Sequence, residues 1–123
     1  MQFDISITEN IACISLDGDL NALDLMFMFQ SNEYKNVIKQ YDKIIIDYLD
    51  ITGVSLTPED AFAITMLGKM DLEHLGKITI VMVVDENERE VMEKVTKSIF
   101  SDSRSNVLVS DSKSNAMHLL QSA

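Results

Sequence analysis

The segment that most constrains the fold runs from Lys43 to Leu67, with the sequence KIIIDYLDITGVSLTPEDAFAITML. Its first part, KIIIDYL, is apolar and β-branched without polar alternation, which is typical of a strand covered on both faces. A small polar loop follows. Thr57-Pro58-Glu59-Asp60 then combines a hydroxyl cap, the only proline of the chain and two acids near the positive end of the helix dipole, which predicts a helix start. A buried strand that leads into a helix, expected to run to about Leu75 and end at Gly76, predicts an α/β fold with this strand central.

The N-terminal part of the chain predicts a hairpin followed by a helix. The short alternating runs FDISI and IACISL are separated by Thr8, Glu9 and Asn10, which is typical of two antiparallel strands joined by a compact turn. After the turn-like DGDLN, the segment from Ala22 to about Tyr34 has apolar residues at helical spacing. Asn21 can cap this helix.

The C-terminal half continues the alternation of strands and helices. KITIVMVV predicts a second buried strand, DENEREVMEKVTKSIF a helix capped by Asp85, NVLVS a short strand, and DSKSNAMHLLQS a short helix opened by Asp111. The long helix has an apolar stripe that is expected to face inward: Val91, Met92, Val95 and Ile99. The order β-β-α-β-α-β-α-β-α requires crossover connections, so it predicts a mixed, mostly parallel sheet with the opening hairpin at one side.

Composition and charge predict one globular domain over residues 1–123 and exclude several classes of partner. Hydrophobic residues make up 46% of the chain and charged residues 24%, which is ordinary for a folded domain. The formal charge of -10, without any cluster of Lys and Arg, argues against nucleic acid and anionic membrane surfaces. Cys13 is the only cysteine, the N-terminus lacks the regions of a signal peptide, and the apolar runs are far too short for a membrane span. These features predict a cytoplasmic protein without membrane insertion.

Residues that could carry catalysis or hold a cofactor are sparse. The two histidines, His74 and His118, have no carboxylate or nucleophile at a spacing that local structure would bring together. The acidic run DENERE lacks the ligand spacing and glycine of a calcium loop. No P-loop, dinucleotide fingerprint, zinc spacing or nucleophile elbow occurs. The sequence therefore predicts no enzyme, no cofactor and no metal site.

The first predicted helix has more apolar residues than one buried stripe needs. In ALDLMFMFQ, Leu25 to Phe29 are all apolar and Leu23 lies close by, and a similar surplus occurs in AFAITML. Either the helix is buried on two sides, or part of it is a contact surface on which Met and Phe suit a protein partner. This surplus also permits a homodimer.

Three motifs in this order resemble the STAS family, the domain of anti-sigma-factor antagonists and sulfate-transporter tails. GDLN, Gly18 to Asn21, resembles the glycine-x-leucine-aspartate that follows the second strand of the family. IIIDYLDIT, Ile44 to Thr52, resembles its third strand and the following turn, and SNAMHLL, Ser114 to Leu120, its final helix. The resemblance covers nearly the whole chain and implies a STAS-like β-β-α-β-α-β-α-β-α fold.

In regulatory STAS members, a serine or threonine between the third strand and the second helix is phosphorylated by a partner kinase, often an anti-sigma factor. The usual motif is aspartate-serine-serine-glycine, and Ser55-Leu56-Thr57-Pro58 falls on it here. Leu56 occupies the position most often phosphorylated, which makes Thr57 the first candidate phosphoacceptor and Ser55 the second. The resemblance implies a docking site for an anti-sigma factor or a serine/threonine kinase-like regulator, formed by Asn21, Ser55, Leu56, Thr57, Glu59, Asp60 and Phe62.

Several readings of this region stay open. Thr57 is either a helix cap alone or also a phosphoacceptor, since a phosphate would suit a helix N-terminus while Glu59 and Asp60 would repel it. The same two acids could instead supply standing negative charge that mimics a modified form. The alternative function is a structural STAS subunit of a membrane lipid-transport ATP-binding cassette system without phosphorylation. A receiver domain is disfavoured because the chain opens with a hairpin and lacks an acidic pair after its first strand.

Overall fold

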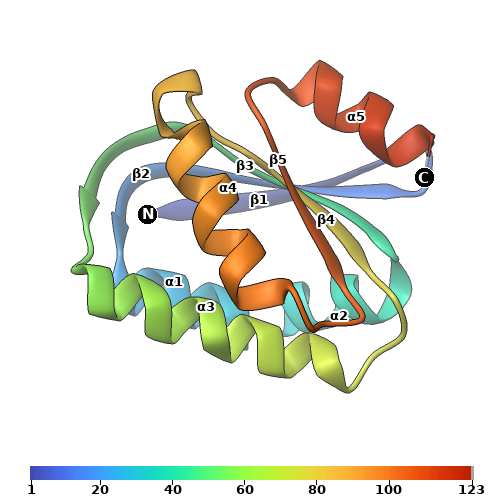
Figure 1. Ribbon diagram of the computed structural model, residues 1–123, viewed down its shortest axis with the longest axis horizontal. Coiled ribbons are helices and arrows are strands. Elements are labelled where there is room, and N and C mark those ends of the chain that lie inside the picture. The colour runs from blue at the N-terminus through green and yellow to red at the C-terminus, as the bar shows by residue number, and fades with distance from the viewer. Residues whose placement is uncertain (123) are drawn as a thin grey trace.

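The computed structural model describes residues 1–122, which form one five-stranded sheet and five helices (Figure 1). The last residue of the predicted 1–123 domain, Ala123, lies outside the described part. The strands are β1 (Gln2–Thr8), β2 (Ile11–Asn21), β3 (Lys43–Ser55), β4 (Thr79–Val83) and β5 (Asn106–Ser110). The helices are α1 (Ala22–Gln30), α2 (Asn32–Gln40), α3 (Pro58–Glu73), α4 (Glu86–Phe100) and α5 (Lys113–Gln121).

The sheet has the strand order β1-β2-β3-β4-β5, so β3 is central. β1 is antiparallel to β2, and every other pair is parallel. This arrangement confirms the predicted α/β fold with a mixed, mostly parallel sheet and a hairpin at one side. The hairpin turn consists of Glu9 and Asn10, both at positive φ (52° and 65°), between the paired residues Thr8 and Ile11. Two positive φ values match the right-handed twist of the flanking strands.

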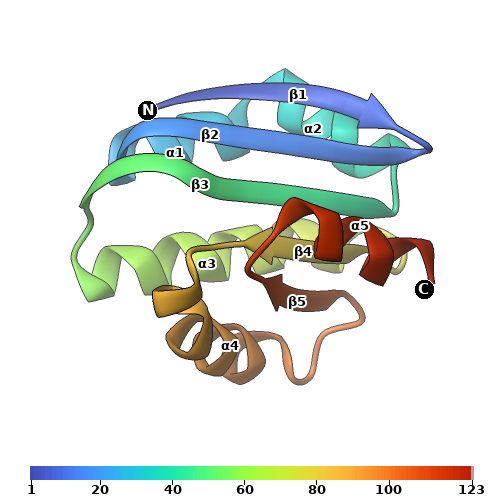
Figure 2. The same cartoon turned by 90° about the horizontal axis from the view of Figure 1, so that it is seen from above.

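Helices cover the two faces of the sheet unequally. α1, α2 and α3 lie along one face, whereas α5 lies on the other face (Figures 1 and 2). Ile44 and Ile46 of β3 belong to the larger core under α1 to α3, and Ile45 belongs to the smaller core under α5. Both faces of the KIII segment are therefore covered, as its unbroken apolar sequence predicts.

The first predicted helix is wrong in its extent. The segment expected to run from Ala22 to about Tyr34 is broken at Ser31, and a second helix, α2, follows that the sequence analysis did not predict. The Ser31 hydroxyl donates to the carbonyl of Met28 at the end of α1 and accepts the N–H of Tyr34 in the first turn of α2. One side chain thus ends one helix and caps the next.

The strand ends also differ from the prediction. DGDLN is not a turn, because β2 continues to Asn21 across a register shift near Gly18, whose φ is +85°. β3 likewise continues through the expected polar loop to Ser55, pairing with β2 as far as Asn21↔Ser55. Only Leu56 and Thr57 connect β3 to α3. The position at which α3 starts is therefore fixed by the sheet.

Two predictions for the C-terminal half are wrong as well. In α4, Ile99 is buried, but Val91 and Val95 are exposed, because the helix packs beside the edge strand β5 and not over the middle of the sheet (Figure 2). α5 is capped by Ser112, which accepts the N–H of Asn115, and not by Asp111. The predicted Asp85 cap of α4 is confirmed by its contact with the N–H of Asn87.

Candidate functional site

The residues expected to dock a partner lie where two strands end and two helices begin. Asn21 and Ser55 are the last residues of β2 and β3 and face each other in the parallel register. α1 starts directly after Asn21, and two residues separate Ser55 from the start of α3. The carboxyl ends of neighbouring parallel strands meet at one edge of the sheet, so Asp19 and Ser55, 36 positions apart in sequence, come into contact there.

Asn21 holds the start of α1. Its side-chain oxygen accepts the N–H of Asp24 at 2.9 Å, and its amide donates to the Asp24 carboxylate at 2.8 Å. The amino group of Met1 also pairs with that carboxylate at 2.9 Å. The hydrogen bond from Asn21, followed by the contact with the amino terminus, lowers the pKa of Asp24 below its usual value of 3.8. Asn21 is therefore a helix cap whose side chain is already occupied.

Ser55 is tied to Asp19 across the ends of β2 and β3. Its hydroxyl donates to Oδ1 of Asp19 at 3.2 Å. The same carboxylate oxygen lies over Gly53, where an added Cβ would approach it to 2.9 Å. The absence of a side chain at Gly53 thus leaves space for the Asp19 carboxylate to reach Ser55. The contact between Asp19 and Ser55 joins the ends of β2 and β3.

Thr57 caps α3 as its sequence predicts. Its backbone is extended (φ -77°, ψ 157°), its hydroxyl accepts the N–H of Asp60 at 3.1 Å, and its carbonyl accepts the N–H of Ala61 at 3.0 Å. Pro58 occupies the first turn, where its missing N–H costs nothing. The hydroxyl stays at an exposed position, so capping and access from solvent coexist.

The other predicted docking residues differ in how much of them solvent can reach. Glu59 and Asp60 are exposed, and neither forms an ion pair within residues 1–122. Phe62 is 56% exposed, on the outer side of α3. Leu56 is half-buried and packs against the larger core, so it supports the connection from below.

The apolar surplus of α1 and α3 is divided between the core and the surface. Leu25 and Met28 of α1, and Ile64 and Leu72 of α3, are buried. Phe29 and Met66 are half-buried. The large apolar side chains that these two adjacent helices expose form what we call the α1–α3 face: Leu23, Met26, Phe27, Phe62, Leu67 and Met70. Met26 and Leu67 line a shared groove of about 200 Å³ between the helices. Each helix therefore buries one part of its apolar surplus and exposes another.

Features of other classes of site are few in the described residues. His74 is the C-terminal cap of α3, and His118 is exposed on α5. Within residues 1–122, no group of three or more His, Cys, Asp or Glu side chains is placed to hold a metal ion. No helix in the same range is long and apolar enough to cross a bilayer.

Asp19 is a site residue that the sequence did not predict, because DGDLN is typical of a turn. A signal was available: Asp19 lies within the GDLN motif, two residues before the capping Asn21. Its carboxylate is the side-chain partner of Ser55, and the pair spans the β2 and β3 ends.

The fold resembles that of an anti-sigma factor antagonist. No family model matches the sequence, and no curated protein matches it. Among solved structures, the anti-sigma factor antagonist SpoIIAA in its unphosphorylated form superposes with a TM-score of 0.60 at 14% identity, over 99% of this chain and 100% of that one. An uncharacterised protein from Shewanella loihica PV-4 with a SpoIIAA-like fold gives a TM-score of 0.59 at 16% identity, over 97% of this chain and 92% of that one. These similarities confirm the predicted STAS-like fold.

Proposed function

We propose that the chain is a non-catalytic, anti-sigma factor antagonist-like domain that binds a protein partner in a partner-switching pathway. The partner is an anti-sigma factor or a serine/threonine kinase-like regulator. The α1–α3 face is the observation that carries the proposal, because α3 exposes three large apolar side chains along its length: Phe62, Leu67 and Met70. The similarity of the fold to SpoIIAA supports the same class of function.

In this proposal the polar start of α3 forms the rim of the docking site and Phe62 its apolar anchor. Aromatic side chains carry much of the energy of protein interfaces, while rim charges set partner choice and association rate. Glu59 and Asp60 give the rim a negative charge that favours a basic patch on the partner. The proposed contact residues are those at the ends of β2 and β3 and in the first turn of α3: Asn21, Ser55, Thr57, Glu59, Asp60 and Phe62, with Leu56 supporting them.

Of the two candidate phosphoacceptors, the geometry favours Thr57. A phosphate on Thr57 would lie at the N-terminus of α3, where the first backbone N–H groups and the helix dipole favour an anion. A phosphate on Ser55 would lie against the Asp19 carboxylate, which is only 3.2 Å from the Ser55 hydroxyl. Like charges at that distance repel strongly, so modification of Ser55 would break the contact between the strand ends.

The test is affinity capture of the tagged chain from its native host, followed by mass spectrometry of the bait and its partners. Phe62→Asp should abolish recovery of an ATP-binding kinase or anti-sigma factor. Val91→Asp is the matched control, because Val91 is 58% exposed and lies on α4, outside the proposed site. Equal loss in both variants, or recovery of transporter subunits in place of a regulator, would contradict the proposal.

Phosphorylation is tested separately on the recovered partner. Incubation with ATP should place phosphate on Thr57 and release the partner, whereas Thr57→Ser should keep both effects and Thr57→Val should lose both. Binding that is insensitive to ATP in all three proteins would show that Thr57 is a cap alone. Selective binding of one partner state under those conditions would then assign the regulatory charge to Glu59 and Asp60.

A further inference from the structure

The outer edge of β1 is open, and apart from the single charge of Asp4 it has none of the features that protect sheet edges. Within residues 1–122, β1 pairs with β2 alone, whereas α4 packs beside β5 at the opposite edge (Figure 2). β1 pairs one-to-one with β2 from Gln2 to Thr8 without a bulge, and its sequence, QFDISIT, has no Lys, Arg or Pro. Edge strands of monomeric proteins are usually interrupted by such residues or bulges.

The backbone groups on this edge alternate in a defined way. A two-residue turn makes the flanking residues Thr8 and Ile11 a hydrogen-bonded pair. Even-numbered residues of β1 therefore direct their N–H and C=O groups towards β2. Phe3, Ile5 and Ile7 direct theirs towards the open edge, and their side chains share the face of the sheet on which α1 and α2 lie.

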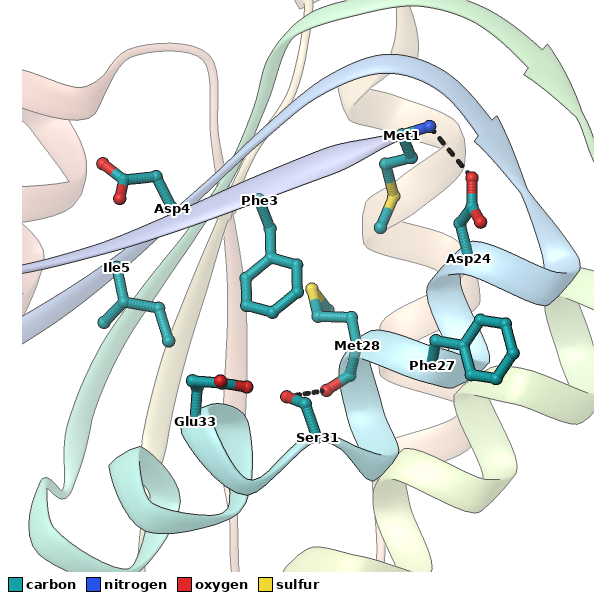
Figure 3. A pocket seen from close by; sticks show the side chains of 9 residues that line it. All are labelled: Met1, Phe3, Asp4, Ile5, Asp24, Phe27, Met28, Ser31 and Glu33. Atoms are coloured by element: carbon teal, nitrogen blue, oxygen red, sulfur yellow. Dashed lines mark hydrogen bonds and ion pairs between the residues drawn. The ribbon is translucent and has the colours of Figure 1, made fainter.

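A hollow lies beside this edge on the same face. Phe3 and Ile5 form one wall, and Phe27, Met28 and Ser31 form the other (Figure 3). Its volume is about 640 Å³, and Ile7, farther along the strand, is 46% exposed. The edge thus combines unpaired backbone groups with apolar side chains that are only partly covered, the two features that a strand added to a sheet requires.

We propose that β1 pairs with β1 of a second copy of the chain in antiparallel fashion, which joins the two sheets into one. The sequence of β1 is self-complementary about Ile5. With Ile5 opposite Ile5 of the second copy, Phe3 lies opposite Ile7 and Asp4 opposite Ser6, so apolar residues meet apolar residues and no like charges are directly opposed.

The hydrogen-bonding pattern fits the same register. Phe3, Ile5 and Ile7 are the residues that point outward, and in this register they pair only with one another, which gives about six new backbone hydrogen bonds. The apolar side chains of the second strand would lie over the mouth of the hollow. Since each chain has a formal charge of -10, long-range repulsion opposes the dimer, and salt should strengthen it.

The first experiment is sedimentation velocity of the wild-type chain from about 10 to 500 µM, which spans the dissociation constants expected of a small interface. The mass should rise from 13.9 kDa towards twice that value, and the dimer fraction should increase between about 0.05 and 0.5 M salt. Ile7→Lys should weaken dimerisation by at least about tenfold, because it places a charge on the edge. Leu23→Lys, on the α1–α3 face and 63% exposed, should not.

A crosslinking pair tests the register without depending on the stability of Ile7→Lys. Under mild oxidation, Ile5→Cys should form a disulfide-linked dimer, because directly opposed residues have Cα atoms about 5.5 Å apart. Thr8→Cys should not, because Thr8 lies opposite Gln2 of the second copy, and the native Cys13 is buried. A chain that stays monomeric throughout, a dimer broken by Leu23→Lys alone, or an edge occupied by a strand of another protein would overturn the proposal.

Discussion

α2 and α3 pack on the same face of the sheet, yet their outer surfaces have opposite character. In α2, the buried side chains are Tyr34, Val37 and Ile38, and all the exposed ones are polar or charged. In α3, Ile64 and Leu72 are buried, but large apolar side chains such as Phe62 and Met70 also face solvent. α2 is therefore explained by folding alone, whereas the outside of α3 requires another explanation, for which a partner is the simplest.

The two helices also differ in how their positions are fixed. α2 is held by a buried aromatic residue, since the ring of Tyr34 meets that of Phe29 edge-to-face with centroids 5.0 Å apart. α3, like α1, begins immediately beyond a paired strand end and is held by a capping side chain. The helix with the apolar outer surface is thus held in place at its start, by the sheet and by the cap.

The largest expected effect is on stability, and it distinguishes a buried ring on α2 from an exposed ring on α3. Tyr34→Ala should lower the free energy of unfolding by about 3–5 kcal/mol, because it removes a fully buried ring and leaves a cavity. Phe62→Ala removes a ring of similar size from an exposed site and should change it by less than about 0.5 kcal/mol. Urea denaturation followed by circular dichroism measures both values. A cost for Phe62→Ala near that of Tyr34→Ala would make Phe62 a packing residue and remove the anchor of the proposed docking site.

A smaller effect is expected at the start of α1. Asn21→Ala should destabilise the protein by about 1 kcal/mol, the usual value of an N-cap, and should raise the pKa of Asp24 because its largest stabilising contact is lost. Carboxyl ¹³C NMR titration measures this pKa directly. Because the pKa of Asp24 is lowered in the folded state, its stabilising contribution is present above the unfolded value of 3.8 and is lost as the pH falls through the lower folded pKa.

Ser112→Ala is the matched control for the Asn21 cap. Ser112 caps α5 through the N–H of Asn115, so its removal should cost a similar free energy. It should leave the pKa of Asp24 unchanged, since α5 lies on the other face of the sheet. If both variants moved the Asp24 titration equally, a general loosening of the fold and not the Asn21 contact would be its cause.

Features with local signals were predictable from the sequence, and features that depend on distant contacts were not. The start of α3 was predicted because Thr57 and Pro58 act through their own backbone and that of the next residues. The break at Ser31 was missed because serine is compatible with a helix and a cap alike, and only its two contacts decide between them. The extension of β2 and β3 was missed because polar residues such as Asp19 and Ser55 become strand ends only when the two segments, far apart in sequence, pair.

The smallest expected effects come from two glycines, one in the strand end that precedes α3 and one within α3. An added Cβ at Gly53 would displace the Asp19 carboxylate from Ser55, so Gly53→Ala should destabilise the protein by about 1 kcal/mol, the value of one hydrogen bond. Gly68 lies inside α3 with no atom within 4 Å of an added Cβ, so Gly68→Ala should stabilise it by about 0.5–1 kcal/mol. Urea denaturation of both variants in the wild-type and Asp19→Ala backgrounds tests the cause. The cost of Gly53→Ala should vanish without Asp19 while the gain at Gly68 persists; a cost that remained would place the strain in the β3 backbone and not in the Asp19–Ser55 contact.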